Sequence, residues 1–365
     1  MRIKILAAGA AVLMGYGCSS DPAANMAFDD VEYVTSFPEV IKLGRGRDID
    51  IEKPGILDIC LYDTLMFVSA PDSEGLVSVY SMPEIKEKGK LFHKGNGPGE
   101  LLSQPFFGSM DIIGDGPDAK ALISDGKGHL LGWNILESGD DPEICIVKDS
   151  IPMGTFYSRY VNDSTFLCRI VNPGRDGQIR YLDVNGCKVV TPSMERLNKS
   201  VIPVKGDGYL FNILSSFAGY DPAHGMVVEA SLMLNTINMY TLDGKFEKTI
   251  CIGKRLDDVE EIFNAGFREL TTTFTRLNLY PDFFAVMYSG IKENSPAGAL
   301  LRPLPKIYIF DWTGSPVAEI RIPEAAQTFE LDLENGRMYT LDSESEKIRV
   351  YDLDTKQLFS RQAQC

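Results

Sequence analysis

Residues suited to acid–base and nucleophilic catalysis are scarce in this sequence. Only three histidines, His93, His129 and His224, occur among the 365 residues. Neither a G-x-S-x-G nucleophile elbow nor an H-E-x-x-H metal-binding pair is present. These absences argue against the common hydrolase classes, and they favour the interpretation that the chain is not an enzyme.

Positive charge is also in short supply. Lysine and arginine number 36 against 51 aspartates and glutamates, which gives a formal net charge of -15. A net acidic surface repels phosphate backbones, so nucleic acid is not expected as a partner. The 44% hydrophobic content is ample for a buried core and excludes a disordered chain.

No C-x-x-C pair occurs, which argues against a zinc ribbon and a thioredoxin-like redox site. Four cysteines lie in apolar strand-like runs, where cysteine often serves as a small buried hydrophobe: Cys60, Cys145, Cys168 and Cys251. An exported chain could pair its cysteines, and Cys168 could meet Cys187 across one hairpin. The disulfide state of these residues and of Cys365 stays open.

The N-terminal apolar stretch, ILAAGAAVLMGYG, is too short to span a bilayer as a stable helix. It follows the basic MRIK and ends at small residues, as a secretory signal does. Cys18 comes next, and this arrangement resembles the lipobox of bacterial lipoproteins, although Gly15 stands where leucine is usual. We expect a signal peptide over residues 1–17, lipid at Cys18, a polar tether over 18–30, and an outer-membrane lipoprotein facing the periplasm or the exterior.

What the sequence does contain is a repeated strand pattern. An alternating apolar run with an aromatic or leucine, followed by turn residues, recurs in Leu76–Glu84, Leu130–Ser138, Ile179–Gly186, Ile237–Lys245, Ile307–Ser315 and Ile348–Lys356. A turn residue and a β run precede each copy, in Tyr62–Ser69, Pro117–Ser124, Asn162–Arg169, Gly206–Ile213, Pro281–Tyr288 and Glu334–Leu341. Further strands complete most units. Six units of four antiparallel strands predict an all-β, six-bladed β-propeller over residues 31–365, because stacked blades bury both faces of each sheet.

Two features lie outside the repeat. Val31–Val34 and Glu39–Leu43 precede the first unit, and we expect them to add a strand to the last blade and close the ring. One short inter-blade helix is predicted at Leu256–Leu270, between units four and five, with Asp257 or Asp258 as its N-cap.

A glycine-rich loop, KGNGPGELLSQP from Lys94 to Pro105, raises the possibility of a phosphate site. A P-loop needs its lysine after the glycines, and a dinucleotide fingerprint needs a helix start; both patterns fail here. The loop instead resembles the blade crossing of NHL-type propellers, through Gly95, Gly97, Pro98, Gly99 and Pro105. The chain as a whole resembles TolB-like six-bladed propeller lipoproteins, a resemblance that implies a fold more than a reaction.

Strand alternation predicts where a binding face lies. In each blade, the loop from the second to the third strand shares one end of the ring with the crossings between blades. Two apparent insertions, Ser216–Gly225 and Ser289–Pro305, are expected at that end together with the glycine loop and the helix. The candidate binding residues on this face are His93, Lys94, Tyr220, His224, Lys292 and Arg302.

The predicted function is a monomeric, lipid-anchored module of the cell envelope that binds a protein, peptide or glycan without catalysis. Two alternatives stay open. The resemblance to six-bladed propellers that are calcium-dependent lactonases or lyases makes a hydrolase or lyase with a channel site the first, and calcium the one cofactor considered. The 15 tyrosines make a carbohydrate-binding surface protein the second.

Overall fold

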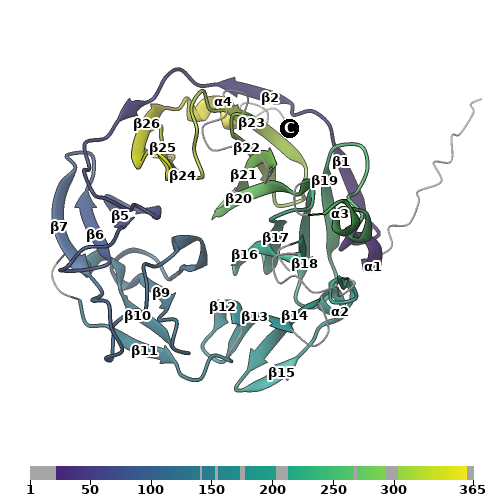
Figure 1. The fold of residues 1–365 in the computed structure, drawn as a ribbon, viewed down its shortest axis with the longest axis horizontal. Coiled ribbons are helices and arrows are strands. Elements are labelled where there is room, and N and C mark those ends of the chain that lie inside the picture. Colours follow the sequence, from purple (N-terminus) through teal and green to yellow (C-terminus); the bar gives the residue numbers. More distant parts are fainter. Residues whose placement is uncertain are drawn as a thin grey trace, which may run out of the picture.

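Six β-sheets surround a central axis as the blades of a propeller in the computed structural model (Figure 1). The structure describes residues 22–139, 142–152, 155–172, 177–202, 213–266, 269–292 and 303–359. Each blade contains four strands in which chain neighbours pair antiparallel, and the first strand of each blade faces the axis. The predicted six-bladed, all-β fold is therefore confirmed.

Blades I to III take their strands in chain order. They are β4 (Asp58–Tyr62), β5 (Leu65–Ser69), β6 (Val77–Ser81) and β7 (Lys86–Leu91); β8 (Asp111–Ile113), β9 (Lys120–Ser124), β10 (Leu130–Asn134) and β11 (Cys145–Lys148); and β12 (Thr155–Asn162), β13 (Thr165–Asn172), β14 (Gly177–Val184) and β15 (Cys187–Val189).

Blades IV to VI continue the pattern. Their strands are β16 (Ser216–Asp221), β17 (Met226–Ser231), β18 (Thr236–Thr241) and β19 (Glu247–Ile252); β20 (Thr271–Tyr280), β21 (Phe283–Lys292), β22 (Lys306–Asp311) and β23 (Pro316–Arg321); and β24 (Thr328–Asp332), β25 (Arg337–Asp342) and β26 (Lys347–Asp352). Blade VI receives its fourth strand from the N-terminal part of the chain.

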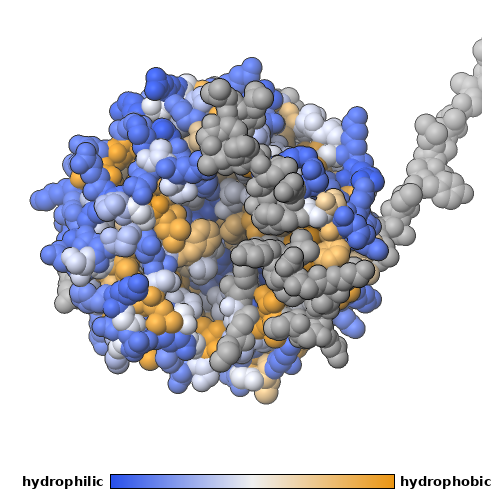
Figure 2. All heavy atoms as spheres, in the orientation of Figure 1, coloured by the Kyte–Doolittle hydropathy of each residue, from blue (hydrophilic) through white to orange (hydrophobic). Residues whose placement is uncertain are grey.

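The core is divided into layers between neighbouring blades. One apolar cluster fills each of the six contacts, for example Phe67 of blade I with Trp133 of blade II, and Phe284 of blade V with Val228 of blade IV. Middle strands such as β6 and β18 are buried on both faces, so they read as near-continuous apolar runs. Figure 2 shows hydrophilic residues around much of the periphery and hydrophobic residues nearer the middle of this face.

The N-terminal arm closes the ring, but not as predicted. β1 (Val31–Val34) and β2 (Glu39–Lys42) add as parallel outer strands to β19 of blade IV and β23 of blade V. The closing strand is β3 (Arg47–Asp48), which pairs antiparallel with β26. The predicted closure was wrong in its residues because the arm first runs along the outside of two other blades (Figure 1).

The helices are few and short. α3 (Val259–Ala265) lies within the predicted helical segment, and Asp258 is its N-cap, since its side chain accepts a hydrogen bond from the Glu261 amide at 2.9 Å. α2 (Pro192–Leu197), which the sequence analysis missed, lies between blades III and IV. α1 (Pro22–Asn25), α4 (Thr355–Phe359) and the 3-10 turns η1 (Phe107–Ser109), η2 (Gly116–Asp118) and η3 (Ile135–Glu137) complete the set for the described residues. None of these described helices is long and apolar enough to span a bilayer.

Four local predictions concern blade IV and the cysteines. The first strand of blade IV is Ser216–Asp221 and the second is Met226–Ser231, so Ser216–Gly225 is a strand with its hairpin turn and not an insertion. Most of the predicted strand Gly206–Ile213 lies outside the described residues. Cys168 and Cys187 are both free, and Cys145, expected to be buried, is exposed.

Candidate functional site

The central channel holds a cavity of about 460 Å³. Its lining includes residues of all six first strands, one from each being Leu61, Asp111, Arg159, Tyr220, Arg276 and Glu330. Residues at the ends of these strands, such as Gly114 and Pro281, also line it. The cavity therefore opens where first strands turn into second strands, which we call the mouth end. The opposite end, which carries the crossings between blades, is the crossing end.

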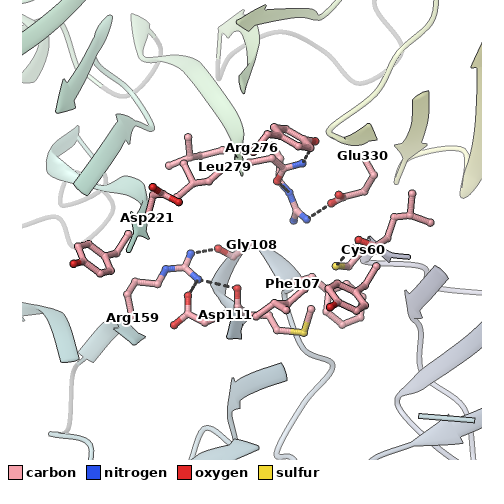
Figure 3. A pocket seen from close by; sticks show the side chains of 18 of the residues that line it. Cys60, Phe107, Gly108, Asp111, Arg159, Asp221, Arg276, Leu279 and Glu330 are labelled. Carbon is pink, nitrogen blue, oxygen red and sulfur yellow. Dashed lines mark hydrogen bonds and ion pairs between the residues drawn. The ribbon is translucent and has the colours of Figure 1, made fainter. Parts of the chain in front are cut away.

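A segment that follows the glycine loop forms the floor of the cavity. Residues Pro105 to Met110, here called the plug, leave the crossing between blades I and II and pack against first strands of several blades. The Asp58 carboxylate accepts hydrogen bonds from the Phe107 and Gly108 amides at 2.8 and 3.3 Å, and the Ser69 hydroxyl donates to the Pro105 carbonyl at 2.7 Å. Phe107 and Gly108 line the cavity from below (Figure 3).

Arg276 connects the plug to blades I and VI. Its Nη1 donates to Asp58 Oδ2 at 2.8 Å, and its Nη2 donates to Glu330 Oε1 at 2.6 Å. One guanidinium thus forms ion pairs with two buried carboxylates. Burial raises the pKa of Glu330 to about 7, although Arg276 favours its charged form. Glu330 is therefore a group at the cavity wall that titrates near neutral pH.

Arg159 holds the plug from the side of blade III. Its Nη1 donates to the Met110 carbonyl and to Asp111 Oδ1, both at 3.1 Å, and its Nη2 donates to the Gly108 carbonyl. The Tyr160 amide donates to the other oxygen of Asp111 at 2.7 Å. Figure 3 shows Arg159 and Arg276 entering the channel from different sides, with Gly108 between them. Burial raises the pKa of Asp111, and the Arg159 charge opposes this shift.

The rim of the cavity is aromatic and acidic. Tyr62 and Tyr220, both half-buried, lie at the ends of first strands, and Asp115 is exposed beside them. Asp221 Oδ2 lies 2.7 Å from His224 Nδ1, and the imidazole stacks on the Trp312 ring at 4.5 Å. The entrance therefore carries tyrosine hydroxyls, which can donate and accept hydrogen bonds, and the carboxylates of Asp115 and Asp221.

The predicted binding face is divided between the two ends of the ring. Lys94 begins the glycine loop and His93 directly precedes it, whereas Lys292 ends β21 and pairs with Glu269 at 2.7 Å; these three belong to the crossing end. Tyr220 and His224 belong to the β16–β17 hairpin at the mouth end, so the prediction of one shared face was wrong. The cause was the strand assignment in blade IV. Arg302 and Cys18 lie outside the described residues.

The glycine loop is a crossing between blades I and II, as predicted. Its Gly97 amide donates to the Glu100 carboxylate at 2.6 Å, and the Lys127 ammonium donates to the Gly97 and Glu100 carbonyls, both at 2.8 Å. Backbone groups of the loop therefore form hydrogen bonds with the side chains of Glu100, in the loop itself, and of Lys127.

Sequence reasoning missed the polar residues of the channel. Arg159 and Arg276 stand inside the runs TFYSRYVN and TTTFTRLNLY, which are otherwise rich in aromatic and β-branched residues. An arginine in the middle of an otherwise strand-forming run, repeated in two units at the same strand, was the available signal. Among described residues, no group of three or more His, Cys, Asp or Glu could hold a metal ion.

The fold and site define a six-bladed propeller with a plugged central cavity. No protein-family model matches the chain, and no curated protein matches its sequence. A solved member of the DUF4221 family from Bacteroides vulgatus is similar at 12% identity, over 87% of this chain and 94% of that one, with a TM-score of 0.49. A Bacteroides fragilis protein whose description proposes export is 12% identical over 88% and 98% of the two chains, with a TM-score of 0.41.

The β-propeller domain of Cps50 (Swd1) from Myceliophteria thermophila is also similar, at 11% identity over 83% of this chain and 98% of that one, with a TM-score of 0.40. The assignment of six blades rests on the strand order of this chain itself. Membership of a TolB-like or NHL-like family stays a prediction.

Proposed function

We propose that this chain is an exported, lipid-anchored propeller that binds a small polar ligand, without catalysis, at the mouth end of its channel. The observation that carries the proposal is the cavity, which first strands of all six blades line and the plug underlies. Because the plug closes one end of the cavity, the channel is better suited to hold a ligand than to let one pass through the ring.

The charged groups on the floor support a binding role indirectly, because they hold the plug that closes the cavity. Arg276 is engaged by Asp58 and Glu330, and Arg159 is engaged by Asp111 and by plug carbonyls. These pairs hold the plug, which makes them part of the framework of the cavity. Tyr62 and Tyr220 on the rim can donate and accept hydrogen bonds, and Asp115 offers a carboxylate, so the proposed ligand carries hydrogen-bond donors, as an amine or a sugar does.

The anchor and the location rest on the sequence. A basic start, a short apolar stretch and Cys18 support export and lipid attachment at Cys18. The purified full-length protein tests this directly, because its intact mass reports both loss of residues 1–17 and addition of acyl chains. An unprocessed chain that carries no lipid would contradict the anchor.

Ligand-observed NMR with pooled amino acids, polyamines and monosaccharides tests the cavity. Ile112 lies on β8, is 37% exposed and lines the cavity, so Ile112→Trp should narrow the cavity and strongly weaken binding. Ile146→Trp is the matched control, since Ile146 is 51% exposed on the outer strand β11 of the same blade. Binding that survives Ile112→Trp would place the ligand elsewhere. Calcium-dependent turnover of a pooled compound would instead favour the hydrolase alternative.

A further inference from the structure

The outer edges of the six blades differ in how they are covered. β1 and β2 cover the outer strands of blades IV and V, whereas β7, β11, β15 and β3, the outer strands of the other four blades, receive no further strand from the described residues. β7 presents charged residues, among them Lys86, Glu87 and Lys88. Blades II and III instead present aliphatic residues: Ile146 and Val147 on β11 are 51% and 41% exposed, and Val189 and Val190 of blade III are 43% and 42% exposed. Of these two edges, that of blade III is the one beside α2.

A third valine belongs to the same outer wall. Three segments lie along the outer side of β14. Val189 of β15 pairs with Leu182, and the side chain of Asn198 bonds the backbone of Arg180. Val201 forms an isolated bridge with Gly177. Val201 is 52% exposed. We call the patch formed by Val189, Val190 and Val201 the blade III wall. α2, which begins directly after Thr191, lies between Val190 and Val201 in the chain.

The chain leads from this wall to the predicted anchor. α1 packs against α2, and Asp29, which follows α1, pairs with Arg196 of α2. Only three residues separate Cys18 from Pro22, the first residue of α1. An extended chain advances at most about 3.5 Å per residue, so a lipid on Cys18 is attached within about 14 Å of α1.

We infer that the blade III wall rests on the lipid surface, so that the ring stands with its edge toward the membrane. The inference rests on the proposed anchor at Cys18, which fixes α1 and its neighbour α2 close to the bilayer. Half-exposed valines gain by contact with acyl chains, and the exposed Lys188 and Lys199 can extend toward headgroups. Glu195, also exposed, offsets part of this charge, so the contact does not depend on anionic lipid.

Hydrogen exchange on the full-length protein in vesicles of phosphatidylethanolamine and phosphatidylglycerol tests the wall. We expect amides of residues 185–190 and 199–202 to exchange roughly tenfold more slowly than in the unanchored Cys18→Ser protein. Residues 86–91 on the outer edge of blade I should not change. Val190→Asp should abolish the protection, whereas Val40→Asp, at a site 44% exposed on β2 of blade V, should leave it intact.

The design separates failure of the wall from failure of the anchor. If intact mass shows no lipid on Cys18, its thiol is coupled to a maleimide lipid in a Cys145→Ser, Cys187→Ser, Cys365→Ser background, and the same exchange is measured. Anchored protein with an unprotected wall would overturn the inference. Protection that appears equally in the unanchored protein and grows with its concentration would assign the wall to a second copy of the chain, which would overturn it as well.

Discussion

At the scale of single residues, the contact between blades III and IV depends on one buried carboxylate. Glu229 accepts hydrogen bonds from Arg180 Nε at 2.8 and 2.9 Å and from the Tyr240 hydroxyl at 2.9 Å, and Arg169 Nη1 lies 3.5 Å away. Both guanidiniums are at least 99% buried. Two buried cations thus share one anion, which makes the carboxylate charge hard to replace.

Glu229→Gln should therefore lower the free energy of unfolding by about 3–5 kcal/mol, because it removes the negative charge that pairs with the buried Arg180 guanidinium and lies 3.5 Å from that of Arg169. Denaturant titration measures the loss. The control is Glu247→Gln, which breaks a partly exposed pair with Arg196 at 2.7 Å and should cost less than about 1 kcal/mol. Equal losses in the two variants would contradict the special role of Glu229.

Glu330 should make stability depend on pH. Its pKa in the folded protein is about 7, against 4.5 for the ordinary side chain, because burial disfavours the charged form. Between these values the folded state keeps a proton that the unfolded state has lost, so stability falls as pH rises. Glu330→Gln should remove this part of the slope, as measured by melting temperatures from pH 4.5 to 8. Exposed Glu84→Gln should leave the slope unchanged, and a slope that persists in Glu330→Gln would contradict the assignment.

At the scale of elements, the glycine loop shows how a backbone requirement can resemble a ligand site. Of its glycines, Gly99 has a positive φ of 75°, a conformation that side chains disfavour. Gly99→Ala should cost about 1 kcal/mol of unfolding free energy. Gly44→Ala, where an added Cβ meets nothing within 4 Å, should be close to neutral by the same thermal melts. A neutral Gly99→Ala would show that the loop relaxes without strain.

The elements that could be predicted are those whose environment repeats. The third strands recur in six similar settings between two apolar neighbours, so their pattern identified β6, β10, β14, β18, β22 and β26. The segments of β1 and β2 were predicted as strands, but their pairing was predicted wrongly and β3 was missed, because the partners of all three lie more than 200 residues away in the chain. α2, six residues long, is also below the length at which helical periodicity is distinct.

The site was harder to predict than the fold. Tyr220 and His224 do lie near the cavity, but the reason given for them depended on a strand assignment in blade IV that was wrong. Asp58 pairs with Arg276, and Arg159 bonds the plug beside them, only because the ring brings first strands of different blades to one axis. Sequence spacing carries no information about which inward side chains face each other across such a channel.

At the scale of the whole molecule, the N-terminal arm serves two different structural purposes. Residues before β3 act as a band around blades IV and V, and they also insert Met26 and Phe28 between blades III and IV, where both are at most 1% exposed. β3 with the following Ile49 and Ile51 joins blade VI to blade I, since both isoleucines pack in the cluster shared by these blades. The two purposes predict different consequences of truncation.

Removing residues 1–44 should lower the melting temperature but leave a closed ring, because β3 still completes blade VI. Removing residues 1–52 also takes away β3, Ile49 and Ile51, which exposes the edge of β26 and opens the contact between blades VI and I. We expect this second variant to show an increased radius of gyration by small-angle X-ray scattering and a broadened melting transition, whereas the first keeps a compact ring. If both truncated proteins have the same radius and the same melting behaviour, the ring is held by the contacts between blades alone, and β3 is not its closure.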